Sequence, residues 1–125
     1  MKNTVLLLAI LLLSACAAKF DTVEYGRLVD MRHIANSSVC VSLEDTKDTL
    51  LLLQEYVQKQ AIYSKHLPNN TATIEMVDAL QNTVDRFAAQ YASRDTASLA
   101  FCRIQMNIIS SQLDAMLATI GRRPR

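Results

Sequence analysis

The stretch LAFCRIQMNIISSQLDAMLATIG, residues 99–121, decides the fold of this 125-residue chain. Its apolar side chains recur at alternating intervals of three and four residues: Leu99, Cys102, Met106, Ile109, Leu113, Met116 and Ile120. This spacing places them in one stripe along a helix, as in the seam of a coiled coil. Gly121 follows as a helix terminator. The stretch therefore predicts a long helix that buries one face within the chain or, as an alternative, against another copy.

A second helix is predicted directly before this stretch, beginning near Thr71 or Thr73. Its apolar residues also recur every three or four positions: Ile74, Val77, Leu80, Val84, Phe87 and Tyr91. Between the two segments the apolar phase slips by one residue, and Ser93 or Asp95 can cap a new helix. The slip favours two helices over the alternative of one bent helix.

The segment from Ser42 to His66 predicts another long helix. Ser42, with Asp45 three residues later, forms a capping pattern, and Pro68 with two asparagines after it ends the segment in a turn. A wide apolar stripe is expected, made of Leu43, Leu50, Leu51, Leu52, Leu53, Tyr56, Val57, Ile62 and Tyr63. Such a stripe predicts contact with more than one neighbouring helix.

A shorter helix is predicted over 21–35, where Asp21 can cap and Glu24 can reach back to close a capping box. Its inward residues are expected to be Val23, Leu28, Met31 and Ile34 or Ala35. The fold class is therefore all-α: a small antiparallel bundle of three long helices plus this shorter N-terminal helix. The scarcity of turn formers, with two glycines and two prolines, agrees with helices.

The first 15 residues have the order of an export signal. Lys2 precedes an apolar block from Val5 to Leu13, and small residues lead to Cys16. The block is too short for a good membrane span, which needs about 20 apolar residues. Leu13-Ser14-Ala15-Cys16 resembles the lipobox of bacterial lipoproteins. The resemblance implies cleavage before Cys16 and acylation of that cysteine.

The same resemblance implies a location. Ala17, rather than aspartate, after the cysteine favours the periplasmic side of the outer membrane in a Gram-negative host. Several acyl chains on Cys16 would make the attachment firm, because one chain alone binds only marginally. The alternatives are an ordinary secretory signal with a chance cysteine, and a cytosolic protein with an apolar first helix.

Cysteine parity gives an independent indication. The chain has three cysteines, and lipid on Cys16 would leave Cys40 and Cys102 as a pair in an oxidising compartment. If the long helices run up, down and up, both cysteines lie at the same end of the bundle. We therefore predict a Cys40–Cys102 disulfide; two buried thiols or an intermolecular bridge are the alternatives.

Candidate chemistry is sparse. His33 and His66 have no ligand partners at metal spacing, the acids at Glu44 and Asp45 suit a helix start, and Cys102 with Met106 lies on the apolar seam. No nucleophile, phosphate-loop or redox motif is found. We expect no enzyme, no metal and no cofactor other than the covalent lipid on Cys16.

Charge bears on possible partners. Thirteen lysines and arginines, including Lys2 in the signal, stand against twelve acids, so no basic field favours nucleic acid. The tail carries Arg122, Arg123 and Arg125, which can contact an anionic surface or an acidic partner; the alternative is a solvated chain end.

Four parts of the chain are therefore expected: a lipoprotein signal over 1–15, a lipidated linker over 16–20, a helical bundle over 21–121 and a basic tail over 122–125. The expected function is a non-enzymatic structural or interaction module, anchored to the membrane and in contact with another envelope protein. In size and layout the chain also loosely resembles small phage or plasmid lipoproteins, including outer lysis spanins and exclusion lipoproteins. A carrier of lipid or a small ligand, with a pocket between the helices predicted over 42–66 and 99–121, is a further alternative.

Overall fold

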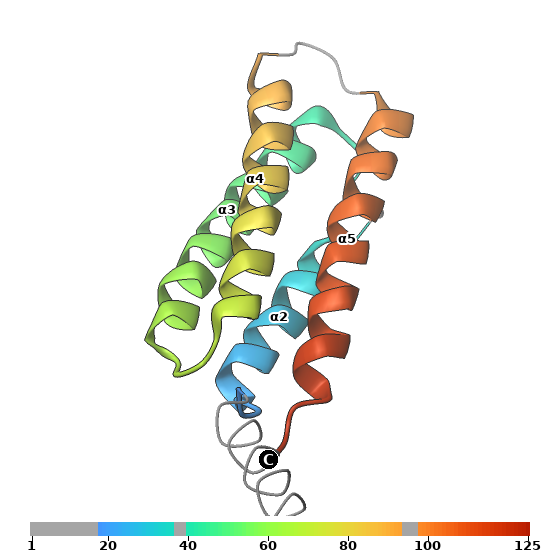
Figure 1. Ribbon diagram of the computed structural model, residues 1–125. Coiled ribbons are helices and arrows are strands. Elements are labelled where there is room, and N and C mark those ends of the chain that lie inside the picture. Colours follow the sequence, from blue (N-terminus) through green and yellow to red (C-terminus); the bar gives the residue numbers. More distant parts are fainter. Residues whose placement is uncertain (1–17, 37–39, 94–97) are drawn as a thin grey trace, which may run out of the picture.

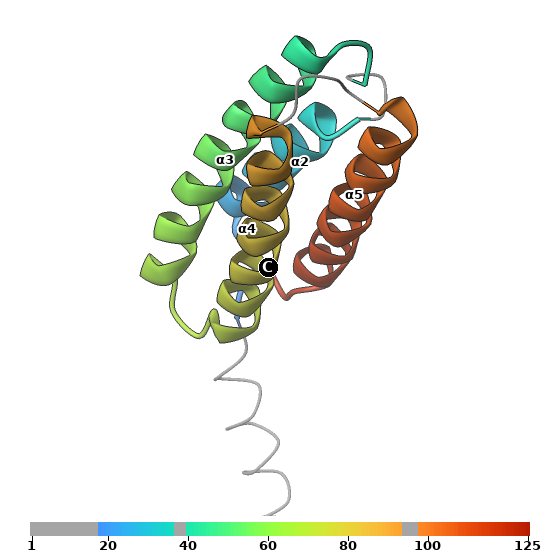
Figure 2. The same cartoon turned by 90° about the horizontal axis from the view of Figure 1, so that it is seen from above.

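The computed structural model describes residues 18–36, 40–93 and 98–125, and these contain four helices and no strand. The helices are α2 (Thr22–Ile34), α3 (Leu43–His66), α4 (Thr71–Ala92) and α5 (Leu99–Gly121). They lie side by side in one bundle (Figures 1 and 2). Both α2 and α4 pack against α3 and α5, so the four helices form a ring around a shared core. The predicted all-α class is confirmed.

Local capping explains where three of the helices begin. The side chain of Asp21 accepts a hydrogen bond from the Glu24 amide (2.7 Å), and that of Ser42 accepts one from the Asp45 amide (3.1 Å). Both caps were expected from the sequence. Ser98 caps α5 in the same way, through the Phe101 amide (3.3 Å). Because α4 ends at Ala92 and α5 has its own cap, the predicted break is confirmed; Asp95 itself lies outside the described residues.

A short turn joins α3 to α4. Asn69 has φ of 55°, in the left-handed region that asparagine tolerates better than most residues. This turn lies at the same end of the bundle as the start of α2 and the end of α5 (Figure 1). We call this the terminal end, because the chain enters the bundle at Asp21 and leaves it after Gly121 there.

The core follows a three–four spacing in every helix. In α5 the buried seam residues are Cys102, Met106, Ile109, Leu113, Met116 and Ile120, and in α4 they are Thr73, Val77, Leu80, Val84, Phe87 and Tyr91. In α3 they are Thr46, Leu50, Leu53, Val57, Gln60 and Ser64, and in α2 they are Glu24, Leu28 and Met31. One seam per helix is enough because each helix packs mainly against two neighbours in the ring.

Several expected core residues are exposed instead. Leu51, Leu52 and Ile62 are 64, 42 and 63 % exposed, so the wide apolar stripe predicted for α3 was wrong. The narrow seam of α3 continues through polar residues rather than widening through leucines. Val23 and Leu99, at the first turns of α2 and α5, are 47 and 42 % exposed.

Cys40 and Cys102 lie at the end of the bundle opposite the terminal end. Their sulfur atoms are 1.97 Å apart, at disulfide distance, and their Cα atoms are 5.8 Å apart. Both residues are buried, and the Thr46 hydroxyl lies 3.6 Å from the Cys102 sulfur. The segment after α2 is thus tied to the second turn of α5, as the predicted pairing requires.

Candidate functional site

The chain enters the bundle through a fixed contact with its own C-terminal segment. The amide of Phe20 donates to the carbonyl of Pro124 at 2.9 Å. The ring of Phe20 lies 5.4 Å from that of Tyr25, and the guanidinium of Arg125 lies 5.2 Å from its centroid. Cys16, the predicted lipid carrier, lies outside the described residues. The first described residue after it is Ala18, so these contacts fix the chain close to the predicted anchor.

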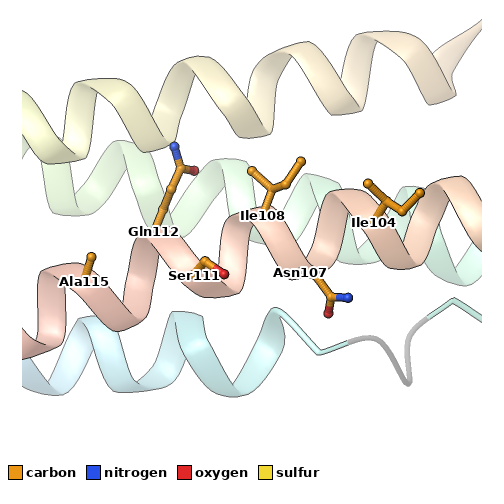
Figure 3. Close-up of a pocket in the computed structure, with 6 residues that line it drawn as sticks. All are labelled: Ile104, Asn107, Ile108, Ser111, Gln112 and Ala115. Carbon is orange, nitrogen blue, oxygen red and sulfur yellow. The ribbon is translucent and has the colours of Figure 1, made fainter.

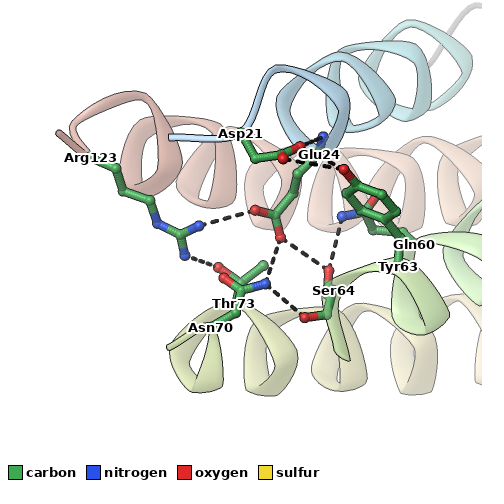
Figure 4. A network of polar contacts seen from close by, with 8 residues as sticks. All are labelled: Asp21, Glu24, Gln60, Tyr63, Ser64, Asn70, Thr73 and Arg123. Carbon is green, nitrogen blue, oxygen red and sulfur yellow. Dashed lines mark hydrogen bonds and ion pairs between the residues drawn. The ribbon is translucent and has the colours of Figure 1, made fainter. Parts of the chain in front are cut away.

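Next to this entry, a carboxylate is completely enclosed (Figure 4). Glu24 Oε1 accepts from the hydroxyl of Ser64 (3.1 Å) and from Nδ2 of Asn70 (3.0 Å). Its Oε2 accepts from Nη1 of Arg123 at 3.0 Å, and Arg123 also donates to the hydroxyl of Thr73. The Glu24 side chain is 0 % exposed and that of Arg123 is 9 % exposed. Both carboxylate oxygens are therefore paired inside the protein.

The network continues along α3. Gln60 Nε2 donates to the Ser64 hydroxyl (3.0 Å), and Asn70 Nδ2 also donates to the Ser64 carbonyl (3.0 Å). Within the described residues, Gln60 Oε1 and Asn70 Oδ1 are buried without a hydrogen-bond donor. Together these contacts join α2, α3, the start of α4 and the C-terminal segment.

Tyr63 adds a second polar link between α3 and α2. Its hydroxyl donates to both carboxylate oxygens of Asp21, at 3.1 and 3.2 Å. Desolvation by burial and then this hydrogen bond raise the pKa of Tyr63 above its ordinary value. The phenol therefore remains a donor throughout the neutral range, and Asp21 serves both as helix cap and as acceptor.

This network corrects two expectations. Glu24 was expected to close a capping box, but its side chain turns into the core, where Arg123 and two neutral donors meet it. Arg123 was expected at an external anionic surface or in a solvated tail, but it is committed to Glu24 and Thr73. Sequence reasoning missed the polar core because it traced apolar residues only. Extending the seam of α3 beyond Val57 by three and four residues would have identified Gln60 and Ser64.

The remaining cations of the tail lie at the surface. Arg122 is exposed and its Nε donates to the Ala118 carbonyl (2.9 Å), and Arg125 is exposed beside Phe20. A hollow of about 120 Å³ lies at the same end and is lined by Lys19, Phe20, Asp21, Leu67, Pro68, Asn70 and Arg123. It combines cationic and apolar side chains at the terminal end.

A different surface feature runs along α5 (Figure 3). A shallow hollow there is lined by Ile104, Asn107, Ile108, Ser111, Gln112 and Ala115, none of which is charged. Ile104 and Ile108 are 56 and 42 % exposed. Gln112 fixes one edge, because its Nε2 donates to the Thr83 hydroxyl of α4 at 3.0 Å.

Among the described residues, no group of three or more histidine, cysteine or acidic side chains is placed to hold a metal ion. His33 and His66 are both exposed. Glu24 is shielded from solvent with both oxygens engaged, so its geometry suits structural pairing rather than proton transfer to a substrate. In the same part of the chain, no helix is long and apolar enough to cross a bilayer.

No protein-family model, no curated protein and no solved structure shows a significant match to this chain. The functional conclusion therefore depends on the residues themselves, above all on those at the terminal end.

Proposed function

We propose that this chain is a bacterial or phage-encoded lipoprotein, a non-enzymatic contact module of the cell envelope. In this proposal residues 1–15 are a cleaved signal, Cys16 carries lipid, and an antiparallel helical bundle lies on the periplasmic side of the outer membrane. The lipobox-like Leu13-Ser14-Ala15-Cys16 supports the anchor. The short α3–α4 turn, which returns the chain to the packed neighbour helix, supports the antiparallel order.

The single observation that carries the proposal is the fixed position of Phe20. It lies four residues after Cys16, and its amide donates a hydrogen bond to the carbonyl of Pro124 at the terminal end. Four residues span at most roughly 14 Å when fully extended. A lipid on Cys16 would therefore hold the terminal end of the bundle close to the bilayer, as expected for a domain built to work at a membrane surface.

Pairing of the other cysteines agrees with export. Cys40 and Cys102 lie at bonding distance, and disulfides persist in oxidising compartments such as the periplasm. With those two paired, Cys16 is the cysteine left for acylation.

Contact with another envelope protein is favoured over ligand transport. A carrier would need room between α3 and α5, but Leu53 and Ile109 are 0 % exposed and Val57 is 1 % exposed. The exposed isoleucines of α5 and leucines of α3 leave surface for a protein partner or for a second copy of the chain. An outer lysis spanin or an exclusion lipoprotein would be a specific form of this function.

Intact mass of the membrane-extracted protein, before and after reduction, tests the anchor and the disulfide. We expect a chain beginning at Cys16 with added acyl mass, and a gain of about 2 Da on reduction without dissociation of a dimer. A Cys16→Ser variant is the matched control and should keep its signal and lack the acyl mass. An unmodified Cys16 in the mature wild-type protein would contradict the proposal.

Photo-crosslinking in cells tests the contact function. A photoreactive residue at Ile108 on α5 is compared with one at Leu51 on α3, since both positions are exposed but lie on different helices. A specific adduct with one envelope protein from only one position would identify the contact face. An inner-membrane partner would favour a spanin, and the absence of a specific adduct at both positions would contradict a protein partner.

A further inference from the structure

Charge is unevenly distributed along the bundle. Among the residues that the structure describes, the terminal end carries four exposed cations: Lys19 before α2, Lys65 in the last turn of α3, and Arg122 and Arg125 after α5. They come from segments far apart in the sequence, so only the fold brings them together. The nearest exposed acid along α4 is Glu75, in its second turn.

The two acids at this end accept hydrogen bonds from groups of the protein itself. Glu24 is fully buried and paired with Arg123, and Asp21 accepts from the amide of Glu24 and the hydroxyl of Tyr63. Glu24 thus adds no outward charge. Asp21 is half-buried and lines the hollow beside Lys19, but the exposed cations outnumber it, so the net outward charge is positive.

At the opposite end the first turns of α3 are acidic, and the exposed cation Arg103 lies in the second turn of α5. The first turns of α3 place Glu44, Asp45 and Asp48 near one another, all exposed, with Lys47 as the cation among them. The bundle therefore has a cationic terminal end and an acidic first turn of α3 at the far end.

Apolar surface lies between the cations of the terminal end. The hollow there is lined by Phe20, Leu67 and Pro68 as well as by Lys19. Cations alternating with aromatic and apolar groups suit the headgroup region of a bilayer, where the charges meet phosphates and the apolar groups leave water.

The proposed lipid on Cys16 keeps these cations within the range of electrostatic attraction to a membrane. Lys19 is three residues from Cys16, and Arg125 lies against the ring of Phe20. Electrostatic attraction to a charged leaflet decays over about 8 to 10 Å at physiological ionic strength. A lipid on Cys16 would hold the terminal end at about this distance, with no long linker to let the bundle turn over.

We infer that the terminal end is a docking surface for anionic phospholipid headgroups of the leaflet that holds the anchor. The inference rests on the proposed lipid attachment and adds an orientation to it. The bundle stands with Lys19, Lys65, Arg122 and Arg125 on the membrane. The Cys40–Cys102 end and the acidic turn of α3 point away from it, toward a partner.

Fluorescence quenching in vesicles tests this orientation. The natural chain has no tryptophan, so single reporters are unambiguous: His66→Trp at the terminal end and Val41→Trp, 73 % exposed in the natural chain, at the far end. The full lipidated protein is reconstituted in vesicles of phosphatidylcholine with or without phosphatidylglycerol, and brominated phospholipid is the quencher. With phosphatidylglycerol we expect quenching of His66→Trp and none of Val41→Trp.

The contribution of the arginines is measured in the same vesicles. Each cation near an anionic leaflet favours docking by about five-fold. The double variant Arg122→Gln, Arg125→Gln should therefore lower the ratio of docked to undocked protein by about 25-fold, and high salt should act in the same direction. The control Arg86→Gln, Arg103→Gln removes the same charge from exposed positions away from the terminal end and should leave quenching unchanged.

Vesicle flotation separates the two possible failures. Protein that does not float would overturn the lipid attachment and the docking together. Protein that floats but shows equal quenching of both reporters would overturn the docking surface alone. The same conclusion would follow if quenching did not change with phosphatidylglycerol or with the arginine variants. Floating protein whose arginine variant loses an acidic protein partner, but not quenching, would assign these cations to that partner instead.

Discussion

Replacing Arg123 by methionine tests the buried ion pair of the terminal end. The change removes the charge but keeps a side chain long enough to cover the site. Glu24 Oε1 keeps its bonds from Ser64 and Asn70, whereas Oε2 loses the guanidinium at 3.0 Å. Removing one partner of a buried ion pair costs roughly 3 to 5 kcal/mol, because the other charge remains desolvated.

The expected cost lies at the lower end of that range, about 3 kcal/mol. Arg123 closes the outer side of the network with 9 % of its side chain exposed, so water can approach Glu24 once the guanidinium is gone. For a domain of this length, such a loss lowers Tm by about 12 to 15 °C. Urea unfolding followed by far-ultraviolet circular dichroism, with the disulfide intact, measures the free energy of unfolding.

Two further variants make the result specific. Glu24→Gln combined with Arg123→Met removes the stranded charge but keeps an oxygen for Ser64 and Asn70, so it should recover about 2 kcal/mol relative to Arg123→Met alone. The control Asp114→Asn breaks the exposed pair with Arg32, whose side chains are 38 and 58 % exposed, and should cost at most about 1 kcal/mol. A cost for Arg123→Met no larger than for Asp114→Asn would refute the reasoning.

Three other perturbations have defined outcomes. Replacing Cys40 and Cys102 by serine opens a closed loop with a sequence separation of 62 and should cost about 4 kcal/mol by the chain-entropy relation; an unchanged urea midpoint would show that the bond adds nothing. Leu113→Ala, at a side chain that is 0 % exposed, should lower the free energy of unfolding by roughly 2 to 5 kcal/mol. Ile108→Ala on the same helix, at a side chain that is 42 % exposed, should lower it by less than about 0.5 kcal/mol. Similar losses in the two variants would contradict the assigned seam. Tyr63→Phe should cost about 1 kcal/mol at neutral pH. Since the folded-state pKa of Tyr63 is raised, its contribution to the free energy of unfolding is complete below pH of about 10 and is lost as pH rises further. A loss of wild-type stability below pH 9 that is absent in Tyr63→Phe would contradict this assignment.

The sequence by itself determined the helices and the cysteine pairing. Periodicity of Val77, Leu80 and Val84, and of Ile109 and Leu113, is a local property that depends only on helix geometry. The caps at Asp21 and Ser42 are likewise local, because each involves residues three apart. Cysteine parity, with the up-and-down order expected for the long helices, was enough to predict which two cysteines meet.

Only the tertiary structure decided what the polar residues do. Glu24 and Arg123 are 99 residues apart and meet because α2 begins where α5 ends. An apolar pattern shows which side of a helix is buried, but polar residues such as Gln60 and Ser64 leave no mark in it when they occupy the same seam. Their burial is stabilised only by partners from other helices, so their role depends on the assembled core. The cationic terminal end has the same origin, since three distant segments contribute to it. The predicted anchor at Cys16, which would bring this end to a membrane, is a property of the sequence alone.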